Sequence, residues 1–506
     1  MCPIETRHLV LSYLLFCMLL FALSLFPNLV NYHGFASAAQ ALEVISSSNN
    51  TNATGDDNVN NNDNIDDTPY GGNRGSPEPV INDPNLKLEL VSQGLQLPTQ
   101  MAFIGPNDIL VLEKDTGMVK RIVNGVSLKE PILDVNVATA YERGLLGIAI
   151  TENVNETTQR NSTNVYLYYT ESEKDANDVC SNTGTCNKNS QPLGNRLYKY
   201  ELVGNTLVNP KLLLDLPASP GAVHNGGAIL IGPDNNIYIP IGEVGYQSGQ
   251  ISNNADGRPV NRTGGILRVT QQGEAVGTSV NVGDENNEIG QNNSLVGIIG
   301  HEDPLNKYYA YGLRNSYGID FDPVTSKLWD TENGPGFGDE VNLVDPGFNS
   351  GWNKVQGNRE YQLKTEEKLR DLGMNYYGGP VASEQPSDLV DFGGRGKYST
   401  PEFTWNQTVG VTAMKFLNSD KLGKDYQNDI FVGDVHNGNL YHFDLSTDRK
   451  QLLVDGPLKD RMANNPDELK GAILGHGFNG ITDIEVGPDG YLYILSFAGS
   501  VFRISS

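Results

Sequence analysis

Positive charge is scarce in this chain of 506 residues, because 36 Lys and Arg residues stand against 61 Asp and Glu residues and leave a net charge of −25. An acidic surface of this kind repels nucleic acid and anionic lipid, so we expect neither as a partner. Charged residues make up only 19% of the chain, and few stretches have the Ala, Leu, Glu and Lys mixture of long helices. Gly, Asn, Thr, Tyr and Val are plentiful instead, which is typical of many short strands and predicts an all-β protein.

Cysteine is almost absent, with four residues in the whole chain. Cys2 and Cys17 lie in the N-terminal segment, so Cys180 and Cys186 are the pair left for the folded part. In an oxidising compartment we predict a local disulfide between them. A zinc site would need further Cys or His residues nearby, and the sequence has none there.

The N-terminus has the pattern of an export signal. Arg7 and His8 precede an uncharged apolar run from Leu9 to about Val30, and small residues follow at 36–39. This order predicts a secretory signal peptide, although the run is nearly long enough to span a bilayer and to remain as an anchor. We therefore predict residues 1–38 to be a signal peptide or membrane anchor. The protein would then be secreted or held, by a possible membrane tether, on the outer side of the cytoplasmic membrane.

A low-complexity stretch follows this signal. From Ser46 to about Pro79 the sequence is rich in Asn, Asp and Ser and has almost no apolar residue. It cannot bury enough surface to offset its chain entropy, so we predict that residues 39–85 form a disordered tether. The folded domain is then expected over residues 86–506.

Within that domain one phrase recurs: an apolar residue, Gly or Asp, Pro, a short turn and an alternating apolar strand. Copies begin at Phe103, Ile231, Phe321 and Val486, and a degenerate copy begins at Tyr426. Pro fixes φ at such a turn, and Asn, Asp and Gly accept its left-handed position. Irregularly spaced hairpins with long insertions predict a β-propeller, with an array of β-sandwiches as the alternative.

Two clusters carry residues suited to acid–base and anion chemistry. His224 lies in the loop phrase Val-His-Asn-Gly-Gly before an apolar strand, where a neutral imidazole could accept a proton from a hydroxyl group. A structural histidine is the alternative. Arg314 lies in a Gly-bounded turn, where its guanidinium could bind a carboxylate or stabilise an oxyanion; pairing with a surface carboxylate is the other reading.

A third cluster runs from Glu332 to Asn342 and combines carboxylates with several glycines. Carboxylate oxygens and exposed backbone carbonyls are ligands for Ca²⁺ rather than for zinc. We therefore predict a calcium site in the segment from Gly334 through Pro335 and Asp339 to Glu340.

Taken in order, these segments resemble the soluble quinoprotein sugar dehydrogenases, that is, the glucose/sorbosone and aldose sugar dehydrogenase family. The matching phrases extend over nearly all of the chain from about Leu86 to Ile504, and they are Leu97-Pro98-Thr99-Gln100-Met101-Ala102, Glu142-Arg143-Gly144-Leu145-Leu146-Gly147, His224-Asn225-Gly226-Gly227, Gly242-Glu243, Gly264-Gly265-Ile266-Leu267-Arg268, Gly312-Leu313-Arg314-Asn315, Glu332-Asn333-Gly334-Pro335, Asp339-Glu340-Val341-Asn342 and Gly351-Trp352. The resemblance implies a six-bladed propeller of four-stranded antiparallel sheets. It also implies pyrroloquinoline quinone (PQQ) and Ca²⁺ as cofactors, and oxidation of an aldose sugar at C1 with an external electron acceptor.

The resemblance also assigns roles to individual residues. His224 matches the base that removes the proton from the anomeric hydroxyl, and Arg314 matches the arginine at the quinone carbonyl. Asn315 matches a cofactor contact, while Gly334 and Pro335 match the pair whose carbonyls bind the cofactor's calcium. Glu243 stands where the family has an acidic residue near the substrate.

Three departures from the family pattern concern charge. Val223 stands in place of an acidic residue before the base, Asp434-Val435-His436 stands where basic residues are expected, and Gly480-Ile481-Thr482 replaces an Arg-x-Arg pair. A tricarboxylate cofactor would lose anchors there. The alternative is therefore a non-catalytic extracellular propeller that binds glycan or protein. A metal-dependent lactone hydrolase on a similar fold would require carboxylates and Asn around the propeller axis.

Overall fold

The computed structural model describes residues 78–155, 160–173, 191–245, 249–277, 297–359 and 388–506. All of them belong to one compact unit that extends from Tyr70 to Ser506. The predicted signal segment 1–38, most of the predicted tether and the pair Cys180 and Cys186 lie outside the described residues. Among the described helices, none has the length and apolar character that a membrane crossing requires.

The repeated sequence phrase forms a hairpin at the inner edge of a sheet. The copy at Ile231 joins β12 (Leu230–Ile231) to β13 (Ile237–Ile241), and its turn is closed by a hydrogen bond from Asn235 N to Gly232 O of 2.9 Å. The copy at Val486 repeats this geometry, with Gly490 N donating to Gly487 O at 2.8 Å. Local turn chemistry therefore sets where each of these strand pairs begins.

The strands form six sheets, which are mainly antiparallel. The first sheet along the chain contains β3 (Pro98–Gly105), β4 (Asp108–Glu113), β5 (Met118–Val123), β6 (Val126–Ser127) and β7 (Leu133–Asp134). The second contains β8 (Leu145–Asn155), β9 (Arg160–Ser172), β10 (Pro192–Val203) and β11 (Thr206–Leu216). The third contains β12, β13, β14 (Gly265–Val269), β15 (Tyr308–Tyr311), β19 (Phe348–Asn349) and β20 (Lys397–Tyr398).

The fourth sheet contains β16 (Ser316–Phe321), β17 (Leu328–Glu332), β18 (Asp339–Val344), β21 (Phe403–Trp405) and β26 (Met462–Ala463). The fifth contains β22 (Val411–Phe416), β23 (Ile430–Asp434), β24 (Leu440–Leu445), β25 (Leu452–Leu453), β27 (Ile473–His476) and β1 (Val80–Ile81). The sixth contains β28 (Ile481–Val486), β29 (Leu492–Ser496), β30 (Ser500–Ser505) and β2 (Lys87–Gln93). Short 3₁₀ helices lie at Gln250–Ser252, Leu305–Lys307, Lys424–Tyr426, Gly456–Leu458 and Glu468–Gly471.

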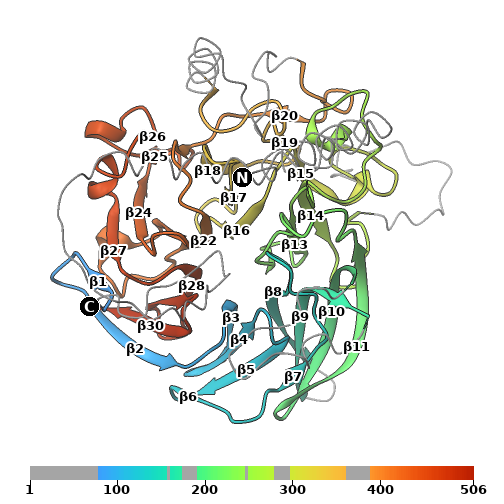
Figure 1. The fold of residues 1–506 in the computed structure, drawn as a ribbon. Helices are drawn as coiled ribbons and strands as arrows, with labels where there is room; N and C mark the ends of the chain where they lie inside the picture. Colours follow the sequence, from blue (N-terminus) through green and yellow to red (C-terminus); the bar gives the residue numbers. More distant parts are fainter. Residues whose placement is uncertain (1–77, 156–159, 174–190, 246–248, 278–296, 360–387) are drawn as a thin grey trace, which may run out of the picture. The chain divides into compact units, whose positions relative to one another are not determined.

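The sheets of this unit are arranged in a closed ring (Figure 1). Around its centre β3 contacts β8, β8 contacts β12, β13 contacts β16, β16 contacts β22, β22 contacts β28, and β28 contacts β3. N-terminal strands complete the last two sheets, because β2 pairs with the C-terminal strand β30 and β1 pairs with β27. The unit is thus a β-propeller, as the sequence predicted.

Two details differ from the prediction. The sheets do not all have four strands, since two have four, two have five and two have six. The additional strands include β19, β20 and β26, which pair in parallel and come from long connections. The second difference is at the start of the domain, because Val80–Ile81 pairs with His476 and Gly475 although it lies within the predicted tether.

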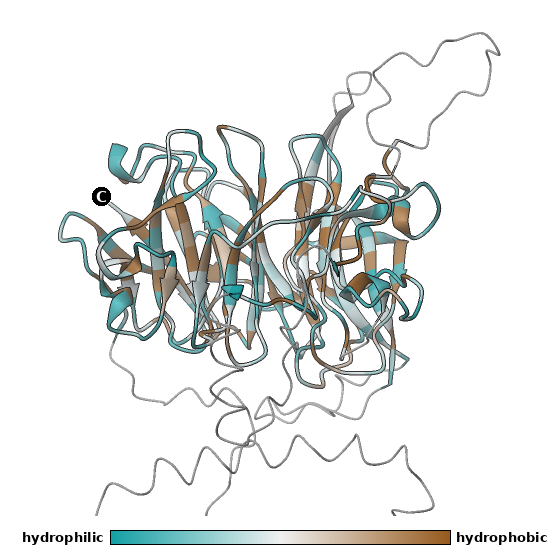
Figure 2. Cartoon of the chain, turned by 90° about the horizontal axis from the view of Figure 1, so that it is seen from above, coloured by the Kyte–Doolittle hydropathy of each residue, from teal (hydrophilic) through white to brown (hydrophobic). Residues whose placement is uncertain are grey.

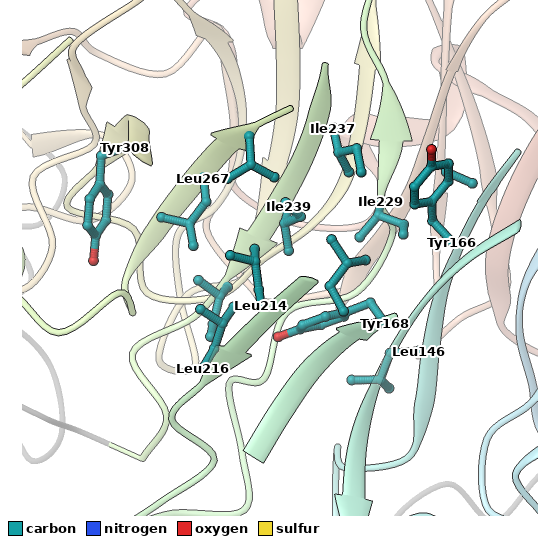
Figure 3. Close-up of a cluster of buried hydrophobic side chains, with 14 of the residues drawn as sticks. Leu146, Tyr166, Tyr168, Leu214, Leu216, Ile229, Ile237, Ile239, Leu267 and Tyr308 are labelled. Atoms are coloured by element: carbon teal, nitrogen blue, oxygen red, sulfur yellow. The ribbon is translucent and has the colours of Figure 1, made fainter. Parts of the chain in front are cut away.

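Apolar side chains fill the space between neighbouring sheets. Leu146 and Tyr168 of the second sheet pack against Ile239 and Leu267 of the third, and all four are at most 1% exposed (Figure 3). Burying one such Leu or Ile contributes about 1.5–3 kcal/mol to folding. Figure 2 shows hydrophobic residues along the strands and many hydrophilic residues in the loops at their ends. The loops are therefore available for function on a rigid support.

Candidate functional site

One cavity of about 210 Å³ collects most of the residues predicted to be functional. His224, Arg314, Asn315, Gly334 and Asp339 line it. The first four come from three inter-strand connections, β11 to β12, β15 to β16 and β17 to β18, and Asp339 is the first residue of β18. The described lining does not include Glu243, Pro335 or Glu340. The structure thus brings the predicted base and the predicted arginine together, while their chemical roles remain predictions.

His224 is held in a fixed position by contacts with two glutamates. Its backbone N–H donates to Oε2 of Glu142 at 2.7 Å, and its Nδ1 lies 2.9 Å from Oε1 of Glu243. An ionised carboxylate can only accept, so in a neutral imidazole Nδ1 carries the proton of this bond and Nε2 is the acceptor nitrogen. The histidine is 3% exposed and has a left-handed backbone with φ of 62°. This arrangement suits a proton acceptor of fixed tautomer.

Glu243 lies behind His224 rather than in the cavity lining, where the sequence predicted contact with a substrate. It is 2% exposed, and its second oxygen accepts the indole N–H of Trp352 at 3.0 Å. Its backbone N–H donates to the carbonyl of Arg314 at 2.9 Å. Gly242 permits this close packing, because a Cβ atom there would lie 2.5 Å from the carbonyl oxygen of His224. Glu243 is therefore placed to position the base.

Arg314 is held at its backbone and at its guanidinium group. Its backbone N–H donates to Oε1 of Glu332 at 2.6 Å, and Nη1 donates to the carbonyl of Asn333 at 2.9 Å. The guanidinium carbon lies 5.6 Å from the ring centroid of Trp352, within the range of a cation–π interaction. Trp352 therefore contacts both Glu243 and Arg314, and it couples the position of the base to that of the cation.

Asn315 and Glu142 are hydrogen-bonded to each other, and both line the cavity that His224 and Arg314 line. The amide of Asn315 donates to Oε2 of Glu142 at 3.0 Å, and its Oδ1 accepts the N–H of Gly226 at 3.3 Å. The predicted cofactor contact at Asn315 thus also has a structural function. Glu142 lines the cavity and was missed as a site residue, although it begins the phrase Glu-Arg-Gly-Leu-Leu-Gly that the sequence comparison had used.

The predicted calcium ligands do not form one group. Asp339 and Glu340 are the first two residues of β18, so their side chains point to opposite faces. Asp339 accepts backbone N–H groups of Gly334, Val409 and Gly410, each at 2.8 Å. Both carboxylate oxygens of Asp339 therefore already accept hydrogen bonds, which hold the loop at Gly334 against the loop at Val409 and Gly410. Burial nevertheless raises the pKa of Asp339.

Glu340 belongs instead to a buried acidic cluster, which we define as Asp330, Glu332 and Glu340. In the pairing of β17 with β18, Glu332 lies opposite Glu340 and Asp330 lies opposite Asn342. In the described part of the chain, no Lys or Arg pairs with these carboxylates. Neither oxygen of Asp330 has a hydrogen bond of full geometry, although the nearby side chains of Ser316 and Asn342 partly offset the effect of burial on its pKa. Burial raises the pKa of Asp330 and of Glu340 to about 7. Burial, and then the charge of Glu340, raises the pKa of Glu332 well above its ordinary value.

Two of the three departures from the family pattern contribute residues to the cavity lining. Val435, His436 and Thr482 all line it, so the residues that stand in place of the expected cations are at the site itself. Within the described lining, two residues carry a permanent positive charge, Arg314 and Lys114. The sequence analysis assigned no site role to Lys114, which directly follows the apolar strand β4.

At the propeller axis, the described residues do not form the cage of carboxylates and Asn that a lactone hydrolase would require. A small cavity of about 30 Å³ lies there, lined by residues of the inner strands that include Lys415, Asp483 and Glu485. Nζ of Lys415 lies 2.8 Å from Oε2 of Glu485 and 3.6 Å from Oδ1 of Asp320. The carboxylates of Glu485 and Asp320 are thus paired with a lysine.

Comparison with known proteins shows that the chain is similar to sugar dehydrogenases. Residues 95–502 match the family model described as Glucose / Sorbosone dehydrogenase. The chain is 23% identical to the aldose sugar dehydrogenase YliI of Escherichia coli (strain K12), over 83% of this chain and 93% of that protein. It is 26% identical to the quinoprotein glucose dehydrogenase B of Acinetobacter calcoaceticus, over 60% of this chain and 61% of that protein.

A solved structure has the same fold. The PQQ-bound form of aldose sugar dehydrogenase from Streptomyces coelicolor superposes with a TM-score of 0.52. The match has 19% identity and covers 83% of this chain and 98% of the other.

Proposed function

Because the chain belongs to the glucose/sorbosone dehydrogenase family, we propose that it is a PQQ-dependent dehydrogenase that oxidises an aldose sugar or a related alcohol at C1. The relatives support this proposal, since they include an aldose sugar dehydrogenase and a quinoprotein glucose dehydrogenase. The observation that carries it is the joint position of His224 and Arg314 on one cavity, with Glu243 behind the histidine.

The chain's residues divide the work of the reaction. His224 takes the proton of the substrate hydroxyl at Nε2, while the carboxylate of Glu243 stabilises the imidazolium that forms. Arg314 supplies hydrogen-bond donors for negative charge that develops on the acceptor oxygen. PQQ, when bound, supplies a quinone that accepts the hydride from C1.

The cavity fits such a cofactor in its chemistry. Arg314 and Lys114 offer cationic donors for carboxylates, and Tyr317, Leu146 and Phe497 offer apolar surface for a planar ring system. Arg314 and Asn315 would hold the cofactor together with the Gly334 loop.

We also propose that the protein binds Ca²⁺, through the buried acidic cluster rather than through Asp339. Asp330 and Asn342 have oxygen atoms without a hydrogen-bond partner in the described structure, and Glu332 and Glu340 lie beside them. Hard oxygen donors of this kind are the ligands that calcium prefers. Since Glu332 also accepts the backbone N–H of Arg314, an ion there would support the cavity wall. A second ion at the carbonyls of Gly334 and Pro335 would accompany the cofactor.

For location, the proposal follows the N-terminal sequence. A charged start, an apolar run and small residues at 36–39 support export, with the propeller outside the cytoplasmic membrane. An external electron acceptor would then reoxidise the cofactor there.

The direct test is reconstitution of the purified protein with PQQ and Ca²⁺, followed by dye-linked oxidation of a panel of aldoses and simple alcohols. We expect quinone binding and turnover with at least one aldose. If the protein binds PQQ at no concentration, the non-catalytic propeller that binds glycan or protein becomes the better account.

Replacing Glu243 with Gln should lower kcat by roughly 10- to 100-fold, the usual cost of losing a group that orients a functional side chain. The amide retains the size of the side chain but can present its NH₂ group to Nδ1 and favour the wrong tautomer. PQQ affinity should stay unchanged, because Glu243 does not line the cavity. A variant with normal kcat would contradict the positioning role.

Removal of calcium should lower the melting temperature. An ion that binds only the folded state stabilises it by RT ln(1 + [L]/Kd), or about 2.7 kcal/mol at a hundredfold excess over Kd. Differential scanning calorimetry with chelator and with excess Ca²⁺ measures this directly. The variant Glu340→Gln should lose most of the calcium response, whereas Asp448→Asn, at an exposed position, should keep it. Equal responses in these two variants would exclude the acidic cluster as the site.

A further inference from the structure

Lys114 is the second permanent cation in the described lining of the active-site cavity. It comes from the first sheet, directly after β4, whereas Arg314 comes from the connection between the third and fourth sheets. Arg314 is assigned above to the acceptor oxygen. A cofactor with several carboxylates would therefore find one further fixed cation in this lining.

The backbone of Lys114 is fixed between two sheets. Its N–H donates to the carbonyl of Leu97 at 3.1 Å, and its own carbonyl accepts the N–H of Leu145 at 2.9 Å. Gly144 leaves room for the lysine stem, because a Cβ atom there would lie 2.6 Å from Cγ of Lys114. With φ of 148°, position 144 also disfavours any other residue. The lysine is thus held beside the cavity by its own main chain.

Its ammonium group retains hydrogen-bonding capacity. Nζ donates to Oδ1 of Asp115 at 2.6 Å, and this is its one partner among the described residues. An ammonium has three N–H donors, so two are left for a ligand, although the side chain is only 12% exposed. Burying unused donors costs free energy, and a carboxylate in the cavity would remove that cost.

The carboxylates of the lining do not compete strongly for this lysine. Asp339 accepts three backbone N–H groups, and Oε2 of Glu142 accepts the N–H of His224 and the amide of Asn315. Both are therefore held by donors other than Lys114. Asp115 is thus the one carboxylate paired with Lys114 among the described residues, and an added carboxylate would meet the N–H donors of the ammonium group that Asp115 does not use.

From this geometry we propose that Lys114 binds a carboxylate of the quinone cofactor and acts as an anchor in a cavity where Val435, His436 and Thr482 line other parts of the wall. The inference rests on the proposed function, because it requires that PQQ is the ligand. It adds a cofactor-binding residue that no sequence motif identified.

The test is an equilibrium titration of the full-length protein with PQQ in the presence of Ca²⁺, followed by protein fluorescence or by quinone absorbance. Lys114→Gln should weaken binding by roughly 10- to 100-fold, as expected for loss of a charge-assisted hydrogen bond. Lys114→Arg should restore much of the affinity, since it keeps the charge. Lys120→Gln is the matched control, because Lys120 lies on the neighbouring strand β5 and does not line the cavity.

A second ligand separates an anchor from general damage to the cavity. The trimethyl ester of PQQ lacks the negative charges, so Lys114→Gln and the wild type should bind it equally. Equal weakening with both ligands would overturn the proposal, and so would equal affinity of Lys114→Gln and Lys120→Gln for PQQ. If the wild type binds no PQQ, the proposed function itself fails, which is a different result from an unaffected lysine variant.

Discussion

Replacement of His224 with Ala is expected to lower kcat by roughly 10²- to 10⁴-fold, the usual contribution of a general base. The reason is that Nδ1 is held by Glu243, so that Nε2 is the atom available to accept the hydroxyl proton. PQQ affinity should change little, because the histidine is assigned to the substrate and not to the cofactor. Steady-state kinetics on the reconstituted enzyme, together with a PQQ titration, measure both quantities.

The backbone at this position calls for a second variant. His224 has φ of 62°, a left-handed conformation that Asn accepts more readily than Ala. His224→Asn should therefore fold at least as well as His224→Ala while also lacking the base. His476→Ala, at an exposed position on β27, is the control. Turnover near the wild-type level in both His224 variants would remove the histidine from the mechanism.

Much of the fold could be read from local sequence because turn chemistry is local. The phrases at Ile231 and Val486 form the same hydrogen-bonded turn, and each opens a strand pair. The number of strands in each sheet could not be read in this way. The strand Phe348–Asn349 pairs in parallel with β15 and with β20, and such pairing between distant segments has no local signature.

The candidate site shows the same limit. The pairing of His224 with Glu243 spans 19 residues and two loops, so the sequence placed both near the substrate without revealing that one lies behind the other. Asp339 and Glu340 were assigned to one calcium site because carboxylates and glycines lie close together in the sequence there. Since β18 begins at Asp339, strand alternation sends their side chains to opposite faces.

Lys114 illustrates what the sequence could not supply. It is a single cation directly after an apolar strand, and it lines the cavity together with residues from distant parts of the chain. The missing basic residues at 434–436 and 480–482 were visible in the sequence, but the position of Lys114 in the same lining was not.

Arg314→Lys is expected to lower kcat by roughly 10²- to 10³-fold, the cost of removing one preorganised donor from a developing oxyanion. Lysine keeps the positive charge but has no planar fork. It should therefore lose the bond from Nη1 to the carbonyl of Asn333 and the stacking on Trp352. PQQ affinity should fall less in this variant than in Arg314→Ala, since the charge remains.

Arg268→Lys provides the matched control for this experiment. Arg268 also lies over an aromatic ring, with its guanidinium carbon 6.0 Å from the centroid of Tyr238, and it pairs with Asp234 outside the cavity. A comparable loss of turnover in Arg268→Lys would mean that arginine replacement acts through stability. If Arg314→Lys alone loses kcat and the melting temperature is unchanged, the planar guanidinium is required in the reaction itself, because charge without geometry does not replace it.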